Sequence, residues 1–422
     1  MRFLARLLGF LSLLTAGLIY SRINSMRTAV LWPFKVVATG SASLMAAVGA
    51  IAAFAGWRTR DNRALLMGSI GAAMTAYYVA RVTGENTAYD AAFGDDWRAR
   101  VPVQRRRYML PQRLSAQMPT VHDPRVQYNI PYYSVIKNER DLHCDVWQPP
   151  WDVRPSGLAY VYVHGGGWCY GYKDFNTRAL FRHLAAQGHV VVDVDYRLAP
   201  EVQLEDMLAD IKRAIVWVKA HSQDYGINPE RIVLAGGSSG GHLALLAAYT
   251  ANHPQFDPAD IKGDTSVRAV VAFYPPVDIH ALYQYGTRLY DDRYPGKNAL
   301  VAMLKGMGLM RPDDVFIAPP NLMTCLLGDT PENLPERYAQ ASPLSYIGDH
   351  CPPTLLLHGQ HDSLVGVEHS RVLRNALQAN GVDVALVEYP MTDHGFDLSL
   401  PEVSPAAQAA FYDLERFLAL ME

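Results

Sequence analysis

The chain has 422 residues, half of them apolar, and a formal net charge of −3 at neutral pH. This charge excludes the basic surface that nucleic-acid binding requires, and the length allows a membrane module together with one globular domain. No metal-ligand spacing, phosphate-binding glycine loop or internal repeat is present, so we expect no metal, no cofactor and no nucleic-acid partner. The four scattered cysteines allow one or two disulfides if the globular domain is extracytoplasmic; they are Cys144, Cys169, Cys325 and Cys351.

The first 90 residues contain three apolar stretches, at 4–20, 29–57 and 64–80. Each is close to the roughly 20 residues that a helix needs to cross a bilayer. We predict two or three transmembrane helices and prefer three. The first is expected to remain as an anchor, because Thr15-Ala16-Gly17 is a poor signal-peptidase site. Lys35, the only charge in the second stretch, either reaches the membrane surface from a helix end or precedes a span that begins at Val36.

The arginines that flank these stretches predict their orientation. With three spans and a cytoplasmic N-terminus, more arginines lie inside than outside: Arg2, Arg6, Arg58, Arg60 and Arg63 against Arg22 and Arg27. Because positively charged loops favour the cytoplasmic side, we expect a multi-pass membrane protein whose C-terminal domain is extracytoplasmic. With two spans that domain would lie on the side of the N-terminus.

Residues 91–125 are polar and rich in arginine. They fit a linker, a strip that faces anionic lipid, or the first part of a cap over the following domain, and a linker is favoured. The globular domain is expected at 126–422.

A glycine-rich loop follows the first clear buried strand of that domain. The strand is predicted at 159–163, and His164-Gly165-Gly166-Gly167-Trp168 comes directly after it. A bare glycine backbone can turn its amides toward a substrate oxygen that develops negative charge. The loop is therefore a candidate oxyanion hole.

A second strand is predicted at 231–236 and a helix at 242–249, and Gly237-Ser238-Ser239-Gly240-Gly241 between them fits G-x-S-x-G. At a strand-to-helix turn this pattern is typical of a nucleophile elbow, which presents a serine hydroxyl at the end of a sheet. We therefore expect Ser239 to be the nucleophile. The amide of the next residue, Gly240, is expected to bind the oxyanion.

The strand and helix pattern breaks between about residues 278 and 346, where we predict an insertion. Its aromatic residues and methionines fit the lining of an apolar acyl pocket and ordinary core packing about equally well. They are Tyr283, Tyr285, Tyr290, Tyr294, Met303, Met307, Met310 and Met323.

A serine nucleophile needs a base within hydrogen-bond reach and a third group that orients the base. Asp362 and His394 follow successive predicted strands and come after the elbow in the order serine, acid, histidine. We predict that Asp362 is the acid and His394 the base. His358 and His361, close to the acid in sequence, are interpreted as structural or as supports of the catalytic residues.

Together these motifs resemble the hormone-sensitive-lipase-like esterases of the α/β-hydrolase fold, over residues 126–422. The matching residues are 164–167, the segment 195–201 that reads Asp-Tyr-Arg-Leu-Ala-Pro-Glu, the elbow, Asp362, and 394–396. The resemblance implies a mostly parallel, doubly wound sheet with a helical cap that shapes the acyl pocket.

The resemblance also implies roles for individual residues. Gly166, Gly167 and Gly240 match the oxyanion donors, while His164 and residues 196–201 match the scaffold that holds the glycine loop. The family elbow usually reads Gly-Asp-Ser-Ala-Gly-Gly, so this chain departs from it at Ser238, in place of the carboxylate, and at His242, in place of a glycine.

We therefore expect a membrane-anchored serine carboxylesterase or lipase that forms an acyl-enzyme. Its expected partners are a small ester with an apolar acyl group and the lipid bilayer. The elbow departures leave an amidase, an arylformamidase-like hydrolase or an acyltransferase with the same triad as alternatives. From another class, the alternative is an inactive, membrane-tethered binding module.

Overall fold

The computed structural model describes most of the 422 residues. It leaves out 120–121, 136–139, 175, 258–259, 290–300, 303–304, 307–316 and 318.

A single twisted sheet of eight strands forms the centre of the molecule, in the order β1-β2-β4-β3-β5-β6-β7-β8. β2 runs antiparallel to both of its neighbours, and the six strands from β4 to β8 along the sheet are parallel. The strands are β1 (Arg125–Val135), β2 (Arg140–Gln148), β3 (Ala159–Val163), β4 (Val190–Val194), β5 (Ile232–Gly237), β6 (Ala269–Phe273), β7 (Thr354–Gly359) and β8 (Val384–Tyr389). This mostly parallel sheet confirms the predicted α/β-hydrolase fold.

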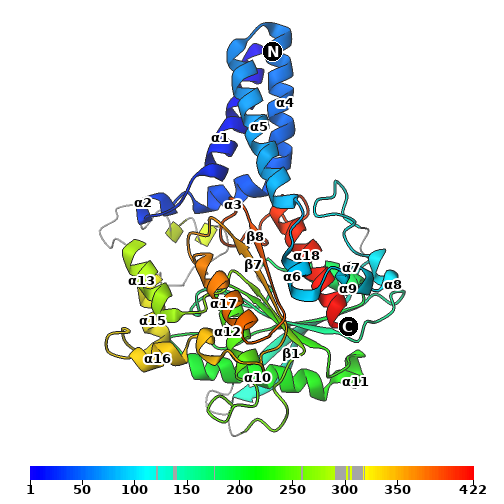
Figure 1. Ribbon diagram of the computed structural model, residues 1–422, viewed down its shortest axis with the longest axis vertical. Helices are drawn as coiled ribbons and strands as arrows, with labels where there is room; N and C mark the ends of the chain where they lie inside the picture. Colours follow the sequence, from blue (N-terminus) through cyan, green and yellow to red (C-terminus); the bar gives the residue numbers. More distant parts are fainter. Residues whose placement is uncertain are drawn as a thin grey trace.

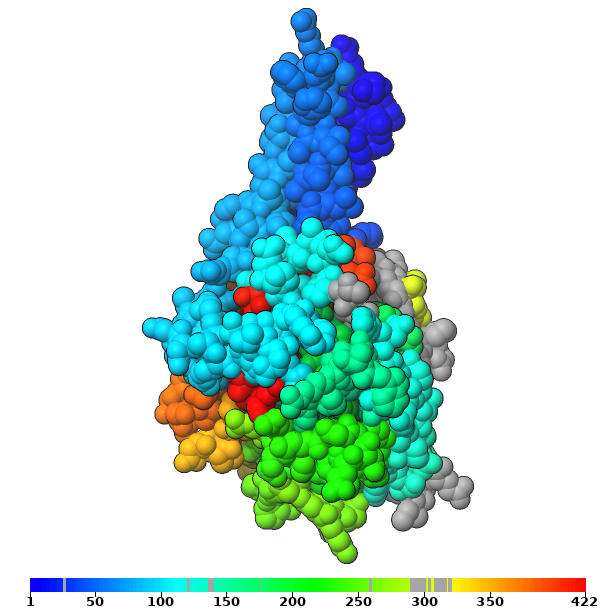
Figure 2. Space-filling model, turned by 90° about the vertical axis from the view of Figure 1, so that its right-hand side faces the viewer, coloured from blue at the N-terminus to red at the C-terminus, as the bar shows by residue number. Residues whose placement is uncertain are grey.

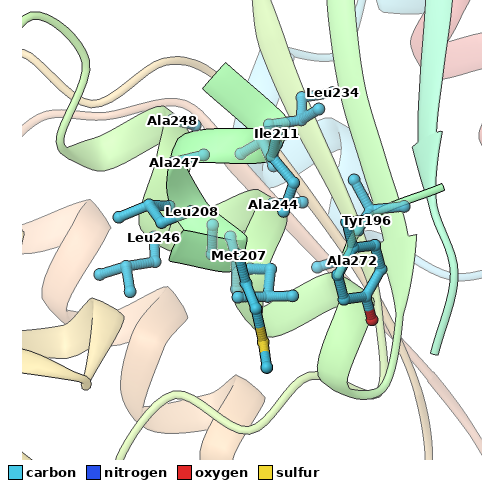
Figure 3. Packing of buried hydrophobic residues seen from close by; sticks show 14 of the residues in the cluster. Tyr196, Met207, Leu208, Ile211, Leu234, Ala244, Leu246, Ala247, Ala248 and Ala272 are labelled. Carbon is cyan, nitrogen blue, oxygen red and sulfur yellow. The ribbon is translucent and has the colours of Figure 1, made fainter. Parts of the chain in front are cut away.

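Helices cover both faces of the sheet, so its parallel strands are buried on both sides and are mostly apolar. One face carries α10 (Leu204–Ala220), α12 (Ser239–Tyr249) and α17 (Glu368–Ala379), and the other carries α9 (Arg178–Ala186) and α18 (Pro405–Met421). Figure 3 shows the first of these layers, where Met207, Leu208 and Ile211 of α10 pack against α12 and against Leu234 of β5. This packing holds the N-terminus of α12 at the end of β5.

The predicted insertion is helical where the structure describes it. It contains α13 (Ile279–Leu289), α15 (Pro319–Leu327), α16 (Pro335–Gln340) and the 3-10 helix η2 (Pro343–Tyr346). Met323 is buried in the core, and Tyr285 donates a hydrogen bond to the carbonyl oxygen of Ser363 at 3.3 Å. Tyr290, Tyr294, Met303, Met307 and Met310 lie outside the described residues.

Three helices form a bundle that rises from the globular domain, with the N-terminus at its far end (Figures 1 and 2). They are α1 (Arg2–Tyr20), α4 (Ala42–Thr59) and α5 (Asn62–Thr83). Among the described residues, three helical stretches are long and apolar enough to cross a membrane: Arg2–Tyr20, Ala42–Thr59 and Asn62–Phe93. Large apolar side chains on their outer surface are exposed, among them Leu14, Phe54 and Leu66.

The second apolar stretch is not one helix, which differs from the prediction. The short α2 (Met26–Ala29) leads into α3 (Trp32–Gly40), which lies across the base of the bundle on the globular domain before α4 begins (Figure 1). Lys35 of α3 does not reach toward a membrane surface, because its side chain is fully buried and pairs with Asp393. Hydropathy alone cannot separate residues that pack on protein from residues that face lipid, so the sequence pattern merged the two helices.

The described residues of the predicted linker at 91–125 pack against the globular domain. After α6 (Ala88–Phe93) come the short helices α7 (Trp97–Arg100) and α8 (Val103–Arg106). The side chain of Arg113 pairs with Asp413 of α18 at 2.9 Å, and that of Arg105 pairs with Glu422 at 3.0 Å. The segment therefore belongs to the layer that covers one face of the sheet.

The Arg113–Asp413 pair predicts that this segment stabilises the domain. Breaking a buried pair leaves a buried charge without its partner, so we expect Arg113→Met to lower the free energy of unfolding by about 3 kcal/mol. Arg98→Ala, which removes an exposed pair with Asp90 from the same segment, is expected to cost about 0–1 kcal/mol. Thermal unfolding of the detergent-solubilised protein measures both, and equal effects would contradict this packing role.

Candidate active site

The turn between β5 and α12 places Ser238 in a strained conformation. β5 ends at Gly237, α12 begins at Ser239, and Ser238 between them has φ 55° and ψ −124°. A non-glycine residue rarely adopts a positive φ, and such strain is found mainly at functional sites. The side chain of Ser238 is partly exposed, whereas Ser239 is 1% exposed and forms the first residue of the helix.

The glycines around this turn identify its centre. A Cβ on Gly236 would lie 2.4 Å from the carbonyl carbon of Gly240, and a Cβ on Gly240 would lie 2.1 Å from the carbonyl oxygen of Val163. A Cβ on Gly237 would be no closer than 3.3 Å to any atom. The positions that require glycine therefore stand two residues before and two residues after Ser238.

The strained turn is therefore centred on Ser238, one residue before Ser239, the predicted nucleophile. Residues 236–241 contain two overlapping G-x-S-x-G patterns, and only the earlier one, centred on Ser238, matches the strained turn. In that frame Gly237 replaces the family aspartate, Ser239 replaces the alanine, and both final glycines are present. The pair of glycines after the serine dipeptide was the signal that would have selected the earlier frame.

The glycine loop after β3 lies next to this turn, because β3 and β5 are neighbours and Val163 is opposite Gly236. Gly166 and Gly167 have φ values of 127° and 61°, a region that glycine adopts without strain. In the described part of the chain, neither amide donates a hydrogen bond to a backbone carbonyl. Gly240, a predicted donor, lies against the start of this loop, since a Cβ there would lie 2.4 Å from the carbonyl oxygen of His164. The amide that directly follows Ser238 is that of Ser239.

The segment after β4 holds the glycine loop, as expected. The ring of Tyr196 stacks on His164 with centroids 4.4 Å apart, and its hydroxyl donates to the carbonyl oxygen of His164 at 3.0 Å. The amide of Ala199 donates to the carbonyl oxygen of Trp168 at 3.0 Å. The predicted scaffold role of His164 and residues 196–201 agrees with these contacts.

Asp362 and His394 come together at the same edge of the sheet. They follow β7 and β8, and the Nδ1 atom of His394 lies 2.8 Å from Oδ2 of Asp362. The other carboxylate oxygen of Asp362 accepts hydrogen bonds from the amides of Leu364 and Val365. Burial opposes ionisation of Asp362, but the charge of His394 and hydrogen bonds from His358 and His394 outweigh it, so its pKa lies below the ordinary value.

Three further histidines near the site have structural surroundings. His358 is buried against Asp362 and bonds to Ser370 and to the carbonyl of Val365. Burial lowers the pKa of His361 to about 4. Burial likewise lowers the pKa of His242 to about 4, and this ring connects the indole N–H of Trp168 with the carbonyl oxygen of Ala341.

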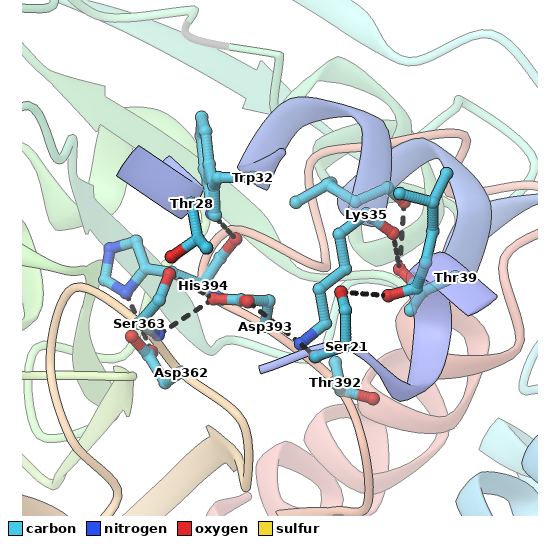
Figure 4. A network of polar contacts seen from close by, with 12 residues as sticks. Ser21, Thr28, Trp32, Lys35, Thr39, Asp362, Ser363, Thr392, Asp393 and His394 are labelled. Carbon is cyan, nitrogen blue, oxygen red and sulfur yellow. Dashed lines mark hydrogen bonds and ion pairs between the residues drawn. The ribbon is translucent and has the colours of Figure 1, made fainter. Parts of the chain in front are cut away.

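Sequence reasoning missed the residues that contact His394 from other elements. The ring of Tyr274, which follows β6, lies 4.3 Å from the His394 ring, and its hydroxyl donates to Asp397. The indole N–H of Trp32 in α3 donates to the carbonyl oxygen of His394 at 3.2 Å (Figure 4). No local pattern around Trp32 or Tyr274 signals these contacts, since they arise only from the tertiary arrangement.

Comparison with known proteins identifies the family. The model of the BD-FAE family matches residues 144–377, more than half of the chain. The chain belongs to the BD-FAE family. A model of the dienelactone hydrolase family also matches residues 338–422, which contain β7, β8, Asp362 and His394. The expected resemblance to α/β-hydrolase-fold esterases is thereby confirmed.

Curated relatives of this BD-FAE family member carry esterase names. "Probable carboxylic ester hydrolase LipM" of Mycobacterium tuberculosis is 36% identical over 262 residues, which cover 61% of this chain and 54% of the relative. "Esterase LipC" of the same organism is 32% identical over 257 residues, which cover 60% and 57%. The chain thus spans about half the length of the curated relatives it matches.

A solved structure shares the fold. The novel thermophilic esterase Est2 from the Planctomycetes species Thermogutta terrifontis, with propionate bound, matches with a TM-score of 0.51 and 25% identity. The match covers 70% of this chain and 93% of that chain, so nearly all of the smaller enzyme corresponds to part of this protein.

The two overlapping G-x-S-x-G patterns, centred on Ser238 and on Ser239, predict different glycines that tolerate a methyl group. We expect Gly236→Ala and Gly240→Ala to destabilise the protein by about 3 kcal/mol or more, because the added Cβ overlaps backbone atoms that cannot move easily. Gly237→Ala is the comparison, because its methyl group would lie 3.3 Å from the hydroxyls of Tyr162 and Tyr274 and would overlap no backbone atom. We expect it to be less destabilising than the other two. Thermal unfolding of the three variants measures the difference in stability. A Gly237 variant as unstable as the other two would favour the pattern centred on Ser239.

Proposed function

We propose that the protein is a membrane-anchored serine carboxylesterase in which Ser238 is the nucleophile, His394 the base and Asp362 the group that orients the base. The observation that carries the proposal is the strained Ser238, which lies at the sheet edge where the His394–Asp362 pair and the glycine loop also lie. The esterase names of the relatives support the reaction class.

The proposed reaction follows from these positions. Ser238 Oγ attacks the ester carbonyl while His394 takes its proton, and the ionised Asp362 stabilises the resulting imidazolium. The amides of Gly166, Gly167 and Ser239 donate to the oxyanion. His394 then protonates the leaving alcohol, and water, activated by the same ring, hydrolyses the acyl-enzyme to release the carboxylic acid.

The acyl group of the substrate is proposed to be apolar. A Cβ on Gly167 would lie 3.1 Å from Cδ1 of Leu322, so the side chain of this residue of α15 stands beside the oxyanion loop. Met323 and Leu326 of the same helix are buried in the core behind it. An aliphatic surface next to the reacting carbonyl favours an aliphatic acyl chain over a charged one.

The bilayer is the second proposed partner. If α1, α4 and α5 cross it, the basic end of the bundle, with Arg2, Arg58 and Arg60, lies on the cytoplasmic side and the catalytic domain on the other. The catalytic edge then faces the membrane, because α3 lies between the bundle and the loop of His394. Exposed Phe34 and Val37 of α3 suit that surface.

The nucleophile is tested by two adjacent serine variants. We expect Ser238→Ala to lower kcat for a short p-nitrophenyl ester by about 10⁶-fold, as removal of a triad nucleophile typically does. Ser239→Ala keeps its backbone amide and is expected to retain most of the activity. Labelling by a fluorophosphonate probe, with Ser239→Ala as the matched control, measures the same difference independently of substrate choice.

The outcome also separates the alternatives. If Ser239→Ala loses the label and Ser238→Ala keeps it, Ser239 is the nucleophile. A wild-type protein that does not react with the probe would indicate a binding module. A panel of matched esters and amides would reveal an amidase by faster turnover of the amides.

The membrane-facing edge predicts that substrate presentation matters. We expect Phe34→Glu to slow hydrolysis of a long-chain ester embedded in vesicles at least several-fold, because a charge on this surface disfavours contact with the acyl region of a bilayer. Hydrolysis of a soluble short ester is expected to be unchanged. Val372→Glu, at an exposed apolar residue of α17, is the matched control. Equal effects on both substrates would contradict delivery from the bilayer.

A further inference from the structure

The N-terminal helices contact the catalytic edge through a buried ion pair. The ammonium group of Lys35 in α3 lies 3.2 Å from Oδ2 of Asp393, and both side chains are 0% exposed. The same ammonium donates to the carbonyl oxygen of Ser21 at 2.7 Å (Figure 4). A residue more than 350 positions away in the chain thus neutralises the carboxylate that directly precedes His394.

Asp393 in turn connects the loop of the base with the loop of the acid. Its Oδ1 atom accepts hydrogen bonds from the amide of His394 at 2.9 Å, from the amide of Ser363 at 2.9 Å and from the Ser363 hydroxyl at 2.8 Å. Ser363 directly follows Asp362. One carboxylate therefore sets the spacing between the backbone of His394 and the backbone beside Asp362.

Two more contacts from the N-terminal helices hold the same loop. The indole of Trp32 donates to the carbonyl oxygen of His394, and the hydroxyl of Tyr78 in α5 lies 3.1 Å from that of Thr392. Thr392, Asp393 and His394 are thus each in contact with a residue of the N-terminal region that the sequence assigns to the membrane. The contacting residues are Tyr78, Lys35 and Trp32 respectively.

We propose that Lys35 is a positioning residue for His394, acting through Asp393, so that the N-terminal helices complete the active site as well as anchor it. The inference rests on the proposed serine esterase function. Anchoring alone does not require a buried ion pair, because desolvation of its charges is costly and apolar side chains often replace a whole pair without loss of stability. A displacement of a catalytic group by about 1 Å can cost roughly 100-fold in rate, which gives such a contact a catalytic consequence.

The charges of Lys35 and Asp393 are expected to affect the pH dependence of kcat/KM, which a purely packing role of these residues would leave unchanged. Among the described residues, the charged and titratable groups that interact with His394 are Asp362, Asp393, Asp397 and Tyr274. Those that interact with Asp362, Asp393 or Lys35 are His358, His361, Tyr285 and Arg22. Removing Lys35 leaves the carboxylate of Asp393 unbalanced and favours the imidazolium of His394. Removing the carboxylate leaves the ammonium unbalanced and disfavours the imidazolium. At acidic pH, kcat/KM falls as His394 is protonated, and we call this part of the pH profile the acidic limb. We expect the acidic limb to move to higher pH when Lys35 is removed and to lower pH when the carboxylate of Asp393 is removed.

The experiment compares Lys35→Met, Asp393→Asn and the double variant in the full-length, detergent-solubilised protein, with a soluble short p-nitrophenyl ester. We expect each single variant to lower kcat at least tenfold with KM changed less than threefold, and the two acidic limbs to shift in opposite directions. In the double variant both charges are absent, so the acidic limb of its kcat/KM profile is expected at the same pH as in the wild type. The effects of two coupled residues are not additive.

A matched control is Lys212→Met, which removes another fully buried lysine, paired with Asp257 away from the catalytic edge. It is expected to lower thermal stability as Lys35→Met does, with kcat and the acidic limb unchanged. Trp32→Phe, which removes only the indole N–H, gives a second test if Lys35→Met does not fold, and we expect a several-fold loss of kcat.

Folded Lys35 and Trp32 variants with wild-type kcat and an unshifted acidic limb would overturn the positioning role. A loss of kcat in Lys212→Met equal to that in Lys35→Met would do the same, because general destabilisation would then explain both. A wild-type protein that does not react with a fluorophosphonate would instead overturn the proposed esterase function itself.

Discussion

The close approach of two backbones at the end of β5 is the constraint on which the site depends. Gly236 and Gly240 touch where the strand turns into α12, and no side chain fits at either position. The chain can make this turn only if Ser238 adopts a positive φ, which lifts its side chain away from the helix that begins at Ser239. The core between α10, α12 and the sheet holds the strained turn in place.

The parallel sheet converts this local turn into a site. Because parallel strands end at one edge, the loops after β3, β5, β7 and β8 meet there, although they are separated by up to about 230 residues in the chain. Burial at that edge is costly for charges, and two buried carboxylates there have ionic partners: His394 for Asp362, and Lys35 for Asp393. The second pair extends the polar network out of the catalytic domain into the N-terminal helices.

Much of this arrangement was predictable from local patterns. The glycine loop at 164–168, Asp362 and His394 each follow an apolar strand, and the order of the motifs identified the fold before any contact was known. The centre of the strand-to-helix turn was harder to predict, since two adjacent serines satisfy the same pentapeptide. The two glycines that follow the serines fit the pattern centred on Ser238, and the backbone angles at Ser238 and the space around Gly236 and Gly240 support it.

The sequence by itself determined the alternation of strands and helices, the apolar N-terminal stretches and the types of residue at the sheet edge, because these depend on periodicity and on neighbours in the chain. Only the tertiary structure decided which serine occupies the strained turn and that Lys35 belongs to α3 beside His394 rather than to a membrane span. Both depend on contacts between distant segments. Hydropathy and motif spacing carry no information about which distant backbone or carboxylate a residue will meet.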